Sequence, residues 1–343
     1  MKDRYAERAE RIDLSDMGGA IMSLPAQIKE GFALGSKLSP PEHESICVTG
    51  MGGSAISGDI LQDLFAQRGE KAVFVNRGYH LPPHIGRKTL LVVISYSGST
   101  EETLSSFRDG LKRGMPILSV TSGGELKRLS DERGIPVIQV PAGYQPRAAL
   151  GYLLFSLLGI LREEIHLTDG EVEEISQKVA RTLRDNSLEV PISDNGSKSL
   201  AQFLLGGSIS IYGVPNLEGA AKRFKCQLNE NSKVIARCEL FPEMNHNDIV
   251  GWVSQDPEKN SVVVLRSAED HPRIKRRIEI TQTLAFGDRA REVVAPSLSI
   301  SDMMCMMAKC DLVSYYLALL REVDPTPVEI ITRMKSDLGG GEG

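Results

Sequence analysis

Short apolar runs alternate with helical stretches along most of this chain, and this order restricts the fold more than any other feature. In the first half, runs rich in β-branched residues lie at 46–49, 72–75, 90–94, 117–120 and 137–140. Helical stretches separate them at about 54–68, 100–113 and 124–133. Parallel strands need a crossover helix between each pair, so the pattern predicts a parallel sheet with helices on its faces.

The second half of the chain repeats this order. The predicted strands lie at 208–212, 234–236, 262–265 and 293–294, and the predicted helices at 218–228 and 274–284. A glycine turn follows the first strand of each half. A long helical run at 302–322 carries four methionines, a pattern typical of core or interface packing. We therefore expect an α/β fold with two doubly wound parallel-sheet domains of similar type.

Helical segments are expected at both ends of the chain and between its two sheets. The predicted divisions are an N-terminal helical segment at 1–36, a first domain at 37–165, linker helices at 166–199, a second domain at 200–300 and C-terminal helices at 301–343. A chain of 343 residues has the length of about two domains, which agrees with this division.

The composition argues against several classes of partner. Lys and Arg total 40 against 45 Asp and Glu, a net charge of -5, and no long basic stripe favours nucleic acid. The N-terminus lacks the apolar segment of a signal peptide, and the apolar stretch at 152–161 is too short to span a bilayer. The five cysteines are scattered without metal-ligand spacing. We therefore expect a cytoplasmic protein with no membrane partner and no structural metal.

A hydroxyl-rich loop, Ser-Tyr-Ser-Gly-Ser-Thr at 95–100, follows an apolar run and precedes a helical stretch. The free N–H groups and the positive dipole end of that helix favour an anion at the loop. Neutral hydroxyls add hydrogen-bonding capacity without adding charge, so the loop suits a small phosphorylated metabolite. The alternative is that Ser99 only caps the helix, with Glu102 completing a capping box.

A glycine turn, Gly-Met-Gly-Gly-Ser at 50–54, follows the first strand. It is weak support for a dinucleotide site, because Ala55 stands where the third glycine belongs and no acidic residue ends the next strand. We expect the turn to bring backbone N–H groups to a ligand beside the 95–100 loop, since both follow strand ends in an open sheet. No cofactor is expected.

These motifs resemble the sugar isomerase (SIS) domain family. The first half carries Gly-Gly-Ser at 52–54 and the hydroxyl-rich loop extended to 103. The second half resembles the bifunctional phosphoglucose/phosphomannose isomerases of archaea and bacteria, in Gly-Ala-Ala-Lys-Arg-Phe-Lys at 219–225, Leu-Asn-Glu-Asn-Ser-Lys at 228–233 and Phe-Pro-Glu-Met-Asn-His-Asn at 241–247. The resemblance covers nearly the whole chain. It implies tandem SIS domains that interconvert glucose 6-phosphate or mannose 6-phosphate with fructose 6-phosphate through a cis-enediol.

Such an isomerisation moves a proton between C1 and C2, which a single carboxylate can do. The resemblance assigns this base to Glu230, which we expect in a turn just past a helix; the simpler alternative is an exposed loop glutamate. Arg147, which follows the last strand of the first domain, is implied to stabilise negative charge on the enediolate. The alternative for Arg147 is a surface arginine that opens the next helix.

The resemblance also implies that His246 and Lys335 open the sugar ring. A histidine titrates near neutral pH and can move the proton of the ring oxygen or of the C1 hydroxyl. Lys335 lies on a helix predicted at 328–338 and is implied to contact the ring oxygen. In the family the matching histidine comes from the neighbouring subunit, which implies a homodimer. The alternatives are a hydrogen-bonded loop histidine and a solvated lysine.

The remaining implied residues bind the substrate. Hydroxyls of the loop and of the glycine turn are implied to hold the phosphate, and Thr326 is implied to handle the mannose epimer unless it is an ordinary turn residue. The implied substrate-binding residues are Gly52, Gly53, Ser54, Ser95, Ser97, Thr100 and Thr326. No metal is required, because acid–base groups can manage the enediol.

Two other functions stay open. A non-catalytic sugar-phosphate sensor keeps the 95–100 loop but does not need Glu230, His246 and Lys335, and it usually carries an added DNA-binding or effector module. An isomerase that acts on another sugar phosphate has the same phosphate site.

Overall fold

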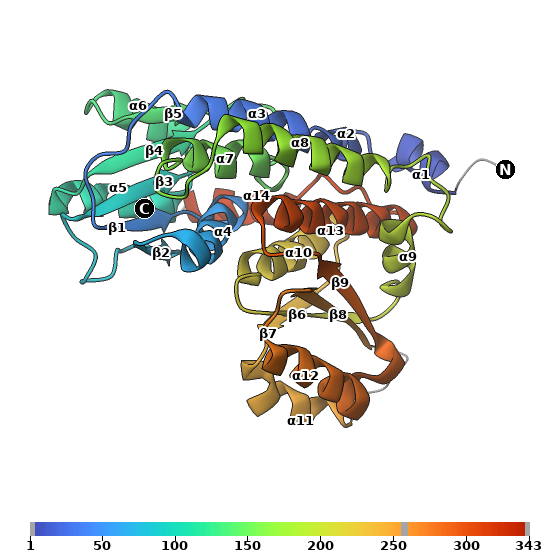
Figure 1. The fold of residues 1–343 in the computed structure, drawn as a ribbon. Helices are drawn as coiled ribbons and strands as arrows, with labels where there is room; N and C mark the ends of the chain where they lie inside the picture. Colours follow the sequence, from blue (N-terminus) through green and yellow to red (C-terminus); the bar gives the residue numbers. More distant parts are fainter. Residues whose placement is uncertain (1–3, 255–259, 340–343) are drawn as a thin grey trace.

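The computed structural model describes residues 4–254 and 260–339, and its two parallel sheets confirm the predicted α/β architecture (Figure 1). The first sheet has the strand order β2-β1-β3-β4-β5. Its strands are β1 (Ser45–Thr49), β2 (Ala72–Asn76), β3 (Thr89–Ile94), β4 (Ile117–Thr121) and β5 (Val137–Gln139). The crossover helices are α4 (Gly52–Arg68), α5 (Glu101–Arg113) and α6 (Gly124–Asp131).

The strand order of the first sheet reverses between β1 and β3, which pair in parallel. The loops that follow these two strands therefore leave the same edge of the sheet side by side, where open α/β sheets bind ligands. Strand β3 is buried on both faces. Leu90, Val92 and Ile94 join the main core, whereas Leu91 and Val93 join the smaller core under α5 and α6.

The second sheet has four parallel strands in the order β7-β6-β8-β9. Its strands are β6 (Ser208–Gly213), β7 (Ala236–Leu240), β8 (Asn260–Ser267) and β9 (Ala290–Ala295). Helices α10 (Glu218–Asn231) and α13 (Ile300–Leu320) lie on one side of this sheet, and α11 (Asp248–Trp252) and α12 (Pro272–Thr281) lie on the other (Figure 1).

The strand predicted at 234–236 was wrong in position. Residues before Ala236 close helix α10 instead: Lys233 has a left-handed φ of 53°, and the N–H of Val234 donates to the carbonyl of Leu228. Strand β7 is an edge strand in which exposed Arg237 and Glu239 alternate with less exposed residues. Charged side chains on its exposed face interrupt the apolar run, so the pattern of apolar residues did not predict this strand.

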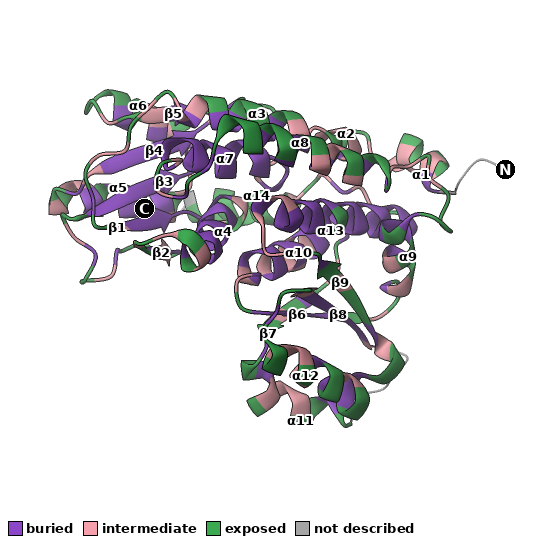
Figure 2. Cartoon of the chain, viewed as in Figure 1, coloured by how far each residue is buried: buried purple, intermediate pink, exposed green. Residues whose placement is uncertain are grey.

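Long helices fill the space between the two sheets. Helix α13 is long and apolar enough to cross a membrane by composition, but 94% of its apolar window is buried inside the protein, so it is a core helix. Figure 2 shows this burial along α13 and across the first sheet. The other described helices are α1 (Arg4–Ile12), α2 (Met17–Met22), α3 (Leu24–Gly35), α7 (Leu150–Ile160), α8 (Asp169–Arg184), α9 (Gly196–Phe203) and α14 (Glu329–Gly339).

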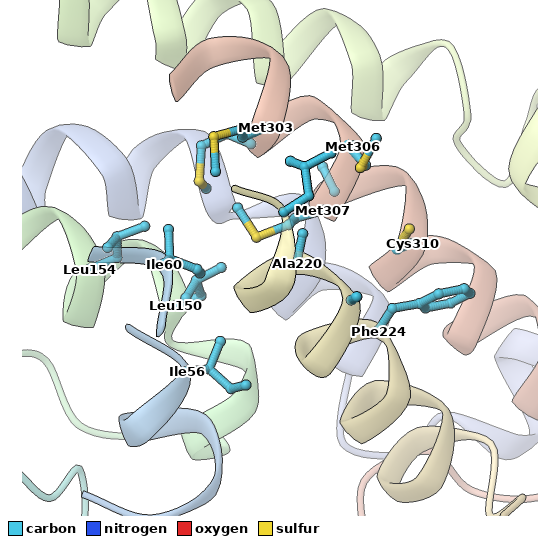
Figure 3. Packing of buried hydrophobic residues seen from close by; sticks show 14 of the residues in the cluster. Ile56, Ile60, Leu150, Leu154, Ala220, Phe224, Met303, Met306, Met307 and Cys310 are labelled. Atoms are coloured by element: carbon cyan, nitrogen blue, oxygen red, sulfur yellow. The ribbon is translucent and has the colours of Figure 1, made fainter. Parts of the chain in front are cut away.

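Helix α4 of the first half packs directly on α10 of the second half. A Cβ atom on Gly219 would lie 2.8 Å from the backbone nitrogen of Ile60, so glycine permits this approach. The Asp63 carboxylate then accepts the N–H of Gly219 at 2.7 Å and caps the start of α10. Figure 3 shows the apolar side chains at this junction, among them Ile56, Ile60, Leu150, Leu154, Ala220, Phe224, Met303, Met306, Met307 and Cys310. The first half therefore fixes the direction of α10.

Candidate active site

The glycine turn after β1 and the hydroxyl-rich loop after β3 lie against each other at the carboxyl edge of the first sheet. A Cβ atom on Gly50 would lie 2.9 Å from a backbone carbonyl of β3. Gly98 has a φ of 73°, and a Cβ atom there would lie 1.9 Å from the carbonyl oxygen of Gly123, so only glycine fits. The N–H of Tyr96 donates to Ser54 Oγ at 3.4 Å. The fold thus brings the two predicted phosphate-binding elements together.

The hydroxyls of this loop fall into two groups. Ser95 is buried, and its Oγ donates to Thr100 Oγ1 at 3.0 Å and accepts the N–H of Thr100 at 3.4 Å. Ser97 and Ser99 are exposed, and their hydroxyl oxygens lie 3.2 Å apart. Ser95 and Thr100 therefore bind each other within the loop, while Ser97 and Ser99 face the solvent.

The capping-box interpretation of Ser99 and Glu102 is wrong. Helix α5 begins at Glu101, its N-cap residue is Thr100, and the Thr100 side chain makes no capping hydrogen bond. The Ser99 hydroxyl donates to Ser97 instead. The N–H groups at the start of α5 therefore lack a side-chain cap from these residues, as an anion site requires.

Arg147 is buried, so the alternative of a surface arginine is wrong. It lies in a 3₁₀ turn (Pro146–Ala148), and its side chain is 3% exposed. The guanidinium donates to Asn231 Oδ1 at 2.6 Å, to Glu230 Oε2 at 3.2 Å, and to the carbonyls of Pro325 at 2.8 Å and Thr326 at 2.9 Å. Burial lowers the pKa of Arg147, and the Glu230 carboxylate opposes this shift. A guanidinium has five N–H donors, so these bonds leave one on Nη1.

The glycine turn after β1 touches this arginine. A Cβ atom on Gly53 would lie 3.0 Å from the backbone of Arg147, so the turn after β1 packs directly on the arginine that faces the second half. Gly52 beside it has a left-handed φ of 50°. This contact links the carboxyl edge of the first sheet to Glu230.

Glu230 occupies the last turn of α10, and the prediction that it lies past the helix was wrong. Its side chain is 26% exposed, and one of its oxygens faces Arg147. It borders a pocket of about 560 Å³ that is also lined by Lys233, Asp324 and the start of α14. A carboxylate with one oxygen held by a cation and a side open to a pocket can exchange protons with a ligand there.

Two buried polar residues of α13, Asp311 and Ser314, hold this end of α10. Asp311 accepts hydrogen bonds from Arg223 at 2.5 Å and from Gln227 at 2.9 Å, and Arg223 also donates to the carbonyl of Arg147 at 3.0 Å. Ser314 Oγ accepts from Asn231 at 3.0 Å. These residues were not predicted, although an aspartate within a run of buried apolar residues was the signal that pointed to them.

Thr326 lies in the turn that connects α13 to α14. Its backbone N–H donates to Asp324 Oδ1 at 2.9 Å, and its carbonyl accepts from Arg147. Its hydroxyl is buried and has no hydrogen-bond partner among the described residues. The structure therefore places Thr326 next to Arg147 with an unused polar group.

His246 and Lys335 are not brought to Glu230 by any contact within the chain. Both are exposed, and the side chain of neither forms a hydrogen bond or an ion pair within residues 4–254 and 260–339. His246 ends a 3₁₀ turn (Glu243–His246) in the second half, and Lys335 lies on the exposed helix α14. No group of three potential metal ligands occurs in the part of the chain that the structure describes.

Comparison with known proteins identifies relatives over nearly the whole chain. Residues 41–135 match the SIS domain family, and residues 193–338 match the bacterial phospho-glucose isomerase C-terminal SIS domain. The bifunctional phosphoglucose/phosphomannose isomerase of Caldicellulosiruptor bescii is 37% identical over 336 residues, which cover 93% of this chain and 98% of that protein. The protein of the same name from Aquifex aeolicus is 34% identical and covers 86% of this chain and 91% of its own length.

Among solved structures, the hypothetical protein TT0462 from Thermus thermophilus has a TM-score of 0.76 at 17% identity. The alignment covers 98% of this chain and 94% of that protein, a similarity that concerns the fold alone. The two family matches include strands of both sheets, and the second match includes Glu230. This chain belongs to the bifunctional phosphoglucose/phosphomannose isomerase family.

Proposed function

We propose that this protein is an aldose–ketose isomerase that interconverts glucose 6-phosphate or mannose 6-phosphate with fructose 6-phosphate. The observation that carries the proposal is the hydrogen bond from Arg147 to Glu230 at 3.2 Å. The same arginine is in contact with the glycine turn that we assign to phosphate binding. A base for the carbon-bound proton and a cation for the developing negative charge thus lie beside an edge suited to anions.

In the proposed reaction, Glu230 removes the C2 proton of the open-chain aldose. The electrons of the C2–H bond form the C1=C2 bond of a cis-enediolate, and the negative charge moves to the C1 oxygen. Because Oε2 of Glu230 accepts from Arg147, Oε1 is the oxygen left to take the proton. The proton of the C2 hydroxyl moves to the C1 oxygen, which shifts the negative charge to the C2 oxygen. Return of the carbon-bound proton from Glu230 to C1 then forms the C2=O bond of the ketose, and the remaining N–H of Arg147 stabilises the enediolate. Rotation about C2–C3 presents the mannose epimer to the same base.

The phosphate is assigned to the hydroxyls of Ser54, Ser95, Ser97 and Thr100 and to backbone N–H groups of Gly52 and Gly53. Binding energy at this remote group positions C1 and C2 next to Glu230 without taking part in the chemistry. Acid–base groups account for every proton in the reaction, so the proposal includes neither a metal nor a cofactor.

We propose that His246 and Lys335 open the sugar ring and that His246 comes from a second copy of the chain. Two apolar residues just past His246, Val250 and Val253, are 73% and 80% exposed. A homodimer would cover them. The five cysteines are free thiols, which supports the cytoplasm as the compartment.

The Glu230→Gln variant tests the base. Glutamine keeps the shape and can still accept from Arg147, but it cannot take a proton. We expect loss of turnover for both aldoses in coupled assays, while calorimetry still detects binding of fructose 6-phosphate. A wild-type protein that binds both sugars without turnover would support the sensor instead. Loss of binding in the correctly folded variant would contradict the assigned role.

Mixed dimers test the source of His246. Co-expression of the Glu230→Gln and His246→Asn chains gives mixed dimers in which one site combines an intact Glu230 with an intact His246, if the two residues come from different copies. We then expect about one quarter of the wild-type activity from two inactive variants. No recovery in verified mixed dimers would place both residues in one chain.

A further inference from the structure

Lys233 has a backbone conformation that lysine rarely adopts. It follows the C-cap of α10 with a φ of 53°, at the position where helices most often end in glycine. A side chain in this left-handed region costs about 1 kcal/mol. Such a strained residue persists only when other interactions hold it. The contacts of the Lys233 side chain therefore identify the interactions that maintain this backbone conformation.

The Lys233 side chain connects the end of α10 to the turn after α13. Its ammonium donates to the carbonyl oxygens of Glu230, of Pro325 at 3.2 Å and of Pro327 at 2.7 Å. An ammonium has three donors, so these carbonyls use its full capacity. The link joins the residue assigned as the base to a segment more than ninety positions later in the sequence.

The turn at 324–327 depends on two cations. Arg147 binds the carbonyls of Pro325 and Thr326, and Lys233 binds those of Pro325 and Pro327. The side chains of α14, which starts immediately after the turn, are exposed from Glu329 onward. Among the described residues, the turn at 324–327 therefore determines where α14 begins.

We propose that Lys233 is a positioning residue that holds the turn at 324–327 and the start of α14 against the end of α10. It acts through backbone carbonyls, so that Glu230, Asp324 and the start of α14 border one pocket. The role in turnover rests on the proposed function, whereas the mechanical role does not.

The Lys233→Gly variant separates the two contributions of this residue. Glycine adopts a φ of 53° without strain, and this relief offsets part of the loss of all three side-chain contacts, so the variant should still fold. We expect kcat to fall by about tenfold or more for both aldoses, since small misplacements of reacting groups have large effects. KM, which reports mainly on the distant phosphate site, should change by less than about threefold. Hydrogen–deuterium exchange at 325–339 should become faster.

His166→Gly is the matched control. His166 has a similar φ of 51°, and it lines a separate hollow near the start of α8. It should leave both kcat and exchange at 325–339 unchanged. Lys233→Met, which keeps the strain and loses the charge, should behave as Lys233→Gly does in exchange. Wild-type kcat in Lys233→Gly, or reduced kcat without faster exchange, would overturn the proposal. If the wild type shows no isomerase activity, the proposed function fails, and exchange alone still decides whether Lys233 holds the turn.

Discussion

Replacement of Asp63 by asparagine should make the protein more stable at alkaline pH and have much less effect at acidic pH. Asp63 lies in the junction of α4 with α10, is 7% exposed and accepts the N–H of Gly219. Burial, with help from the nearby carboxylates of Glu218 and Asp59, raises its pKa from 3.8 to about 7, although the Gly219 hydrogen bond and Lys222 oppose the shift. Asparagine keeps the shape and the acceptor but carries no charge.

The sign and size of the effect follow from linkage. Because the pKa is higher in the folded state, the folded protein binds more protons, and stability falls as pH rises from about 4 to about 7. At about 1.4 kcal/mol per pH unit, the ionised carboxyl costs the folded state about 4 kcal/mol above pH 7. About 3 kcal/mol of this cost develops between pH 5 and pH 8, since the unfolded carboxyl is already ionised at pH 5.

Urea unfolding of both proteins at pH 5, 6, 7 and 8 measures this difference. The stability of Asp63→Asn relative to the wild type should increase by about 3 kcal/mol across the series and then level off. The difference in the free energy of unfolding between the two proteins cancels the contributions of all other titrating groups. The Asp131→Asn variant, at an exposed position, controls for the loss of a carboxylate alone. A difference that stays constant from pH 5 to pH 8 would refute the reasoning, as would a variant less stable than the wild type at pH 8.

Two further predictions concern the phosphate site and its support. Replacing Ser97 by alanine together with Thr100 by valine should raise KM for fructose 6-phosphate by about tenfold or more, because each hydrogen bond to a charged group contributes about 1.5–3 kcal/mol. Steady-state kinetics, with kcat as the internal control, measures this change. An unchanged KM would mean that these hydroxyls do not bind the phosphate. The Asp311→Ala variant should lose about 3–5 kcal/mol in urea unfolding, because it leaves the buried charge of Arg223 unpaired. A loss below 1 kcal/mol would mean that this ion pair does not support α10.

The three inner strands of the first sheet could be predicted from the sequence because they are buried on both faces. Strand β3 is buried at all six positions, so its apolar run has no charged interruption. The turn glycines and the hydroxyl-rich loop could also be placed, since both follow such runs directly. Edge strand β7 could not be recognised in the same way, because Arg237 and Glu239 face the solvent.

The position of Glu230 could not be predicted from local sequence. Asparagines on both sides favour a turn, because their side chains usually compete for nearby backbone groups. Here tertiary partners occupy them: Asn231 binds Arg147 and Ser314, and Asn229 Oδ1 accepts the N–H of Ala236. The backbone is therefore free to continue as helix, and these long-range partners are invisible in a single sequence.

The two halves share a topology, but the segments that follow the corresponding strands β3 and β8 differ in charge. In the second half the corresponding strand, β8, ends at Ser267, whose N–H donates to the Asp270 carboxylate at 3.0 Å. The neighbouring Glu269 carboxylate accepts the N–H of Leu298 at 3.1 Å. Carboxylates of the chain thus occupy backbone donors there, and their charge repels a phosphate. In the proposed reaction the second half instead supplies Glu230 from the far end of α10. Phosphate binding and proton transfer would then come from different halves, and the α4–α10 junction would keep them in register.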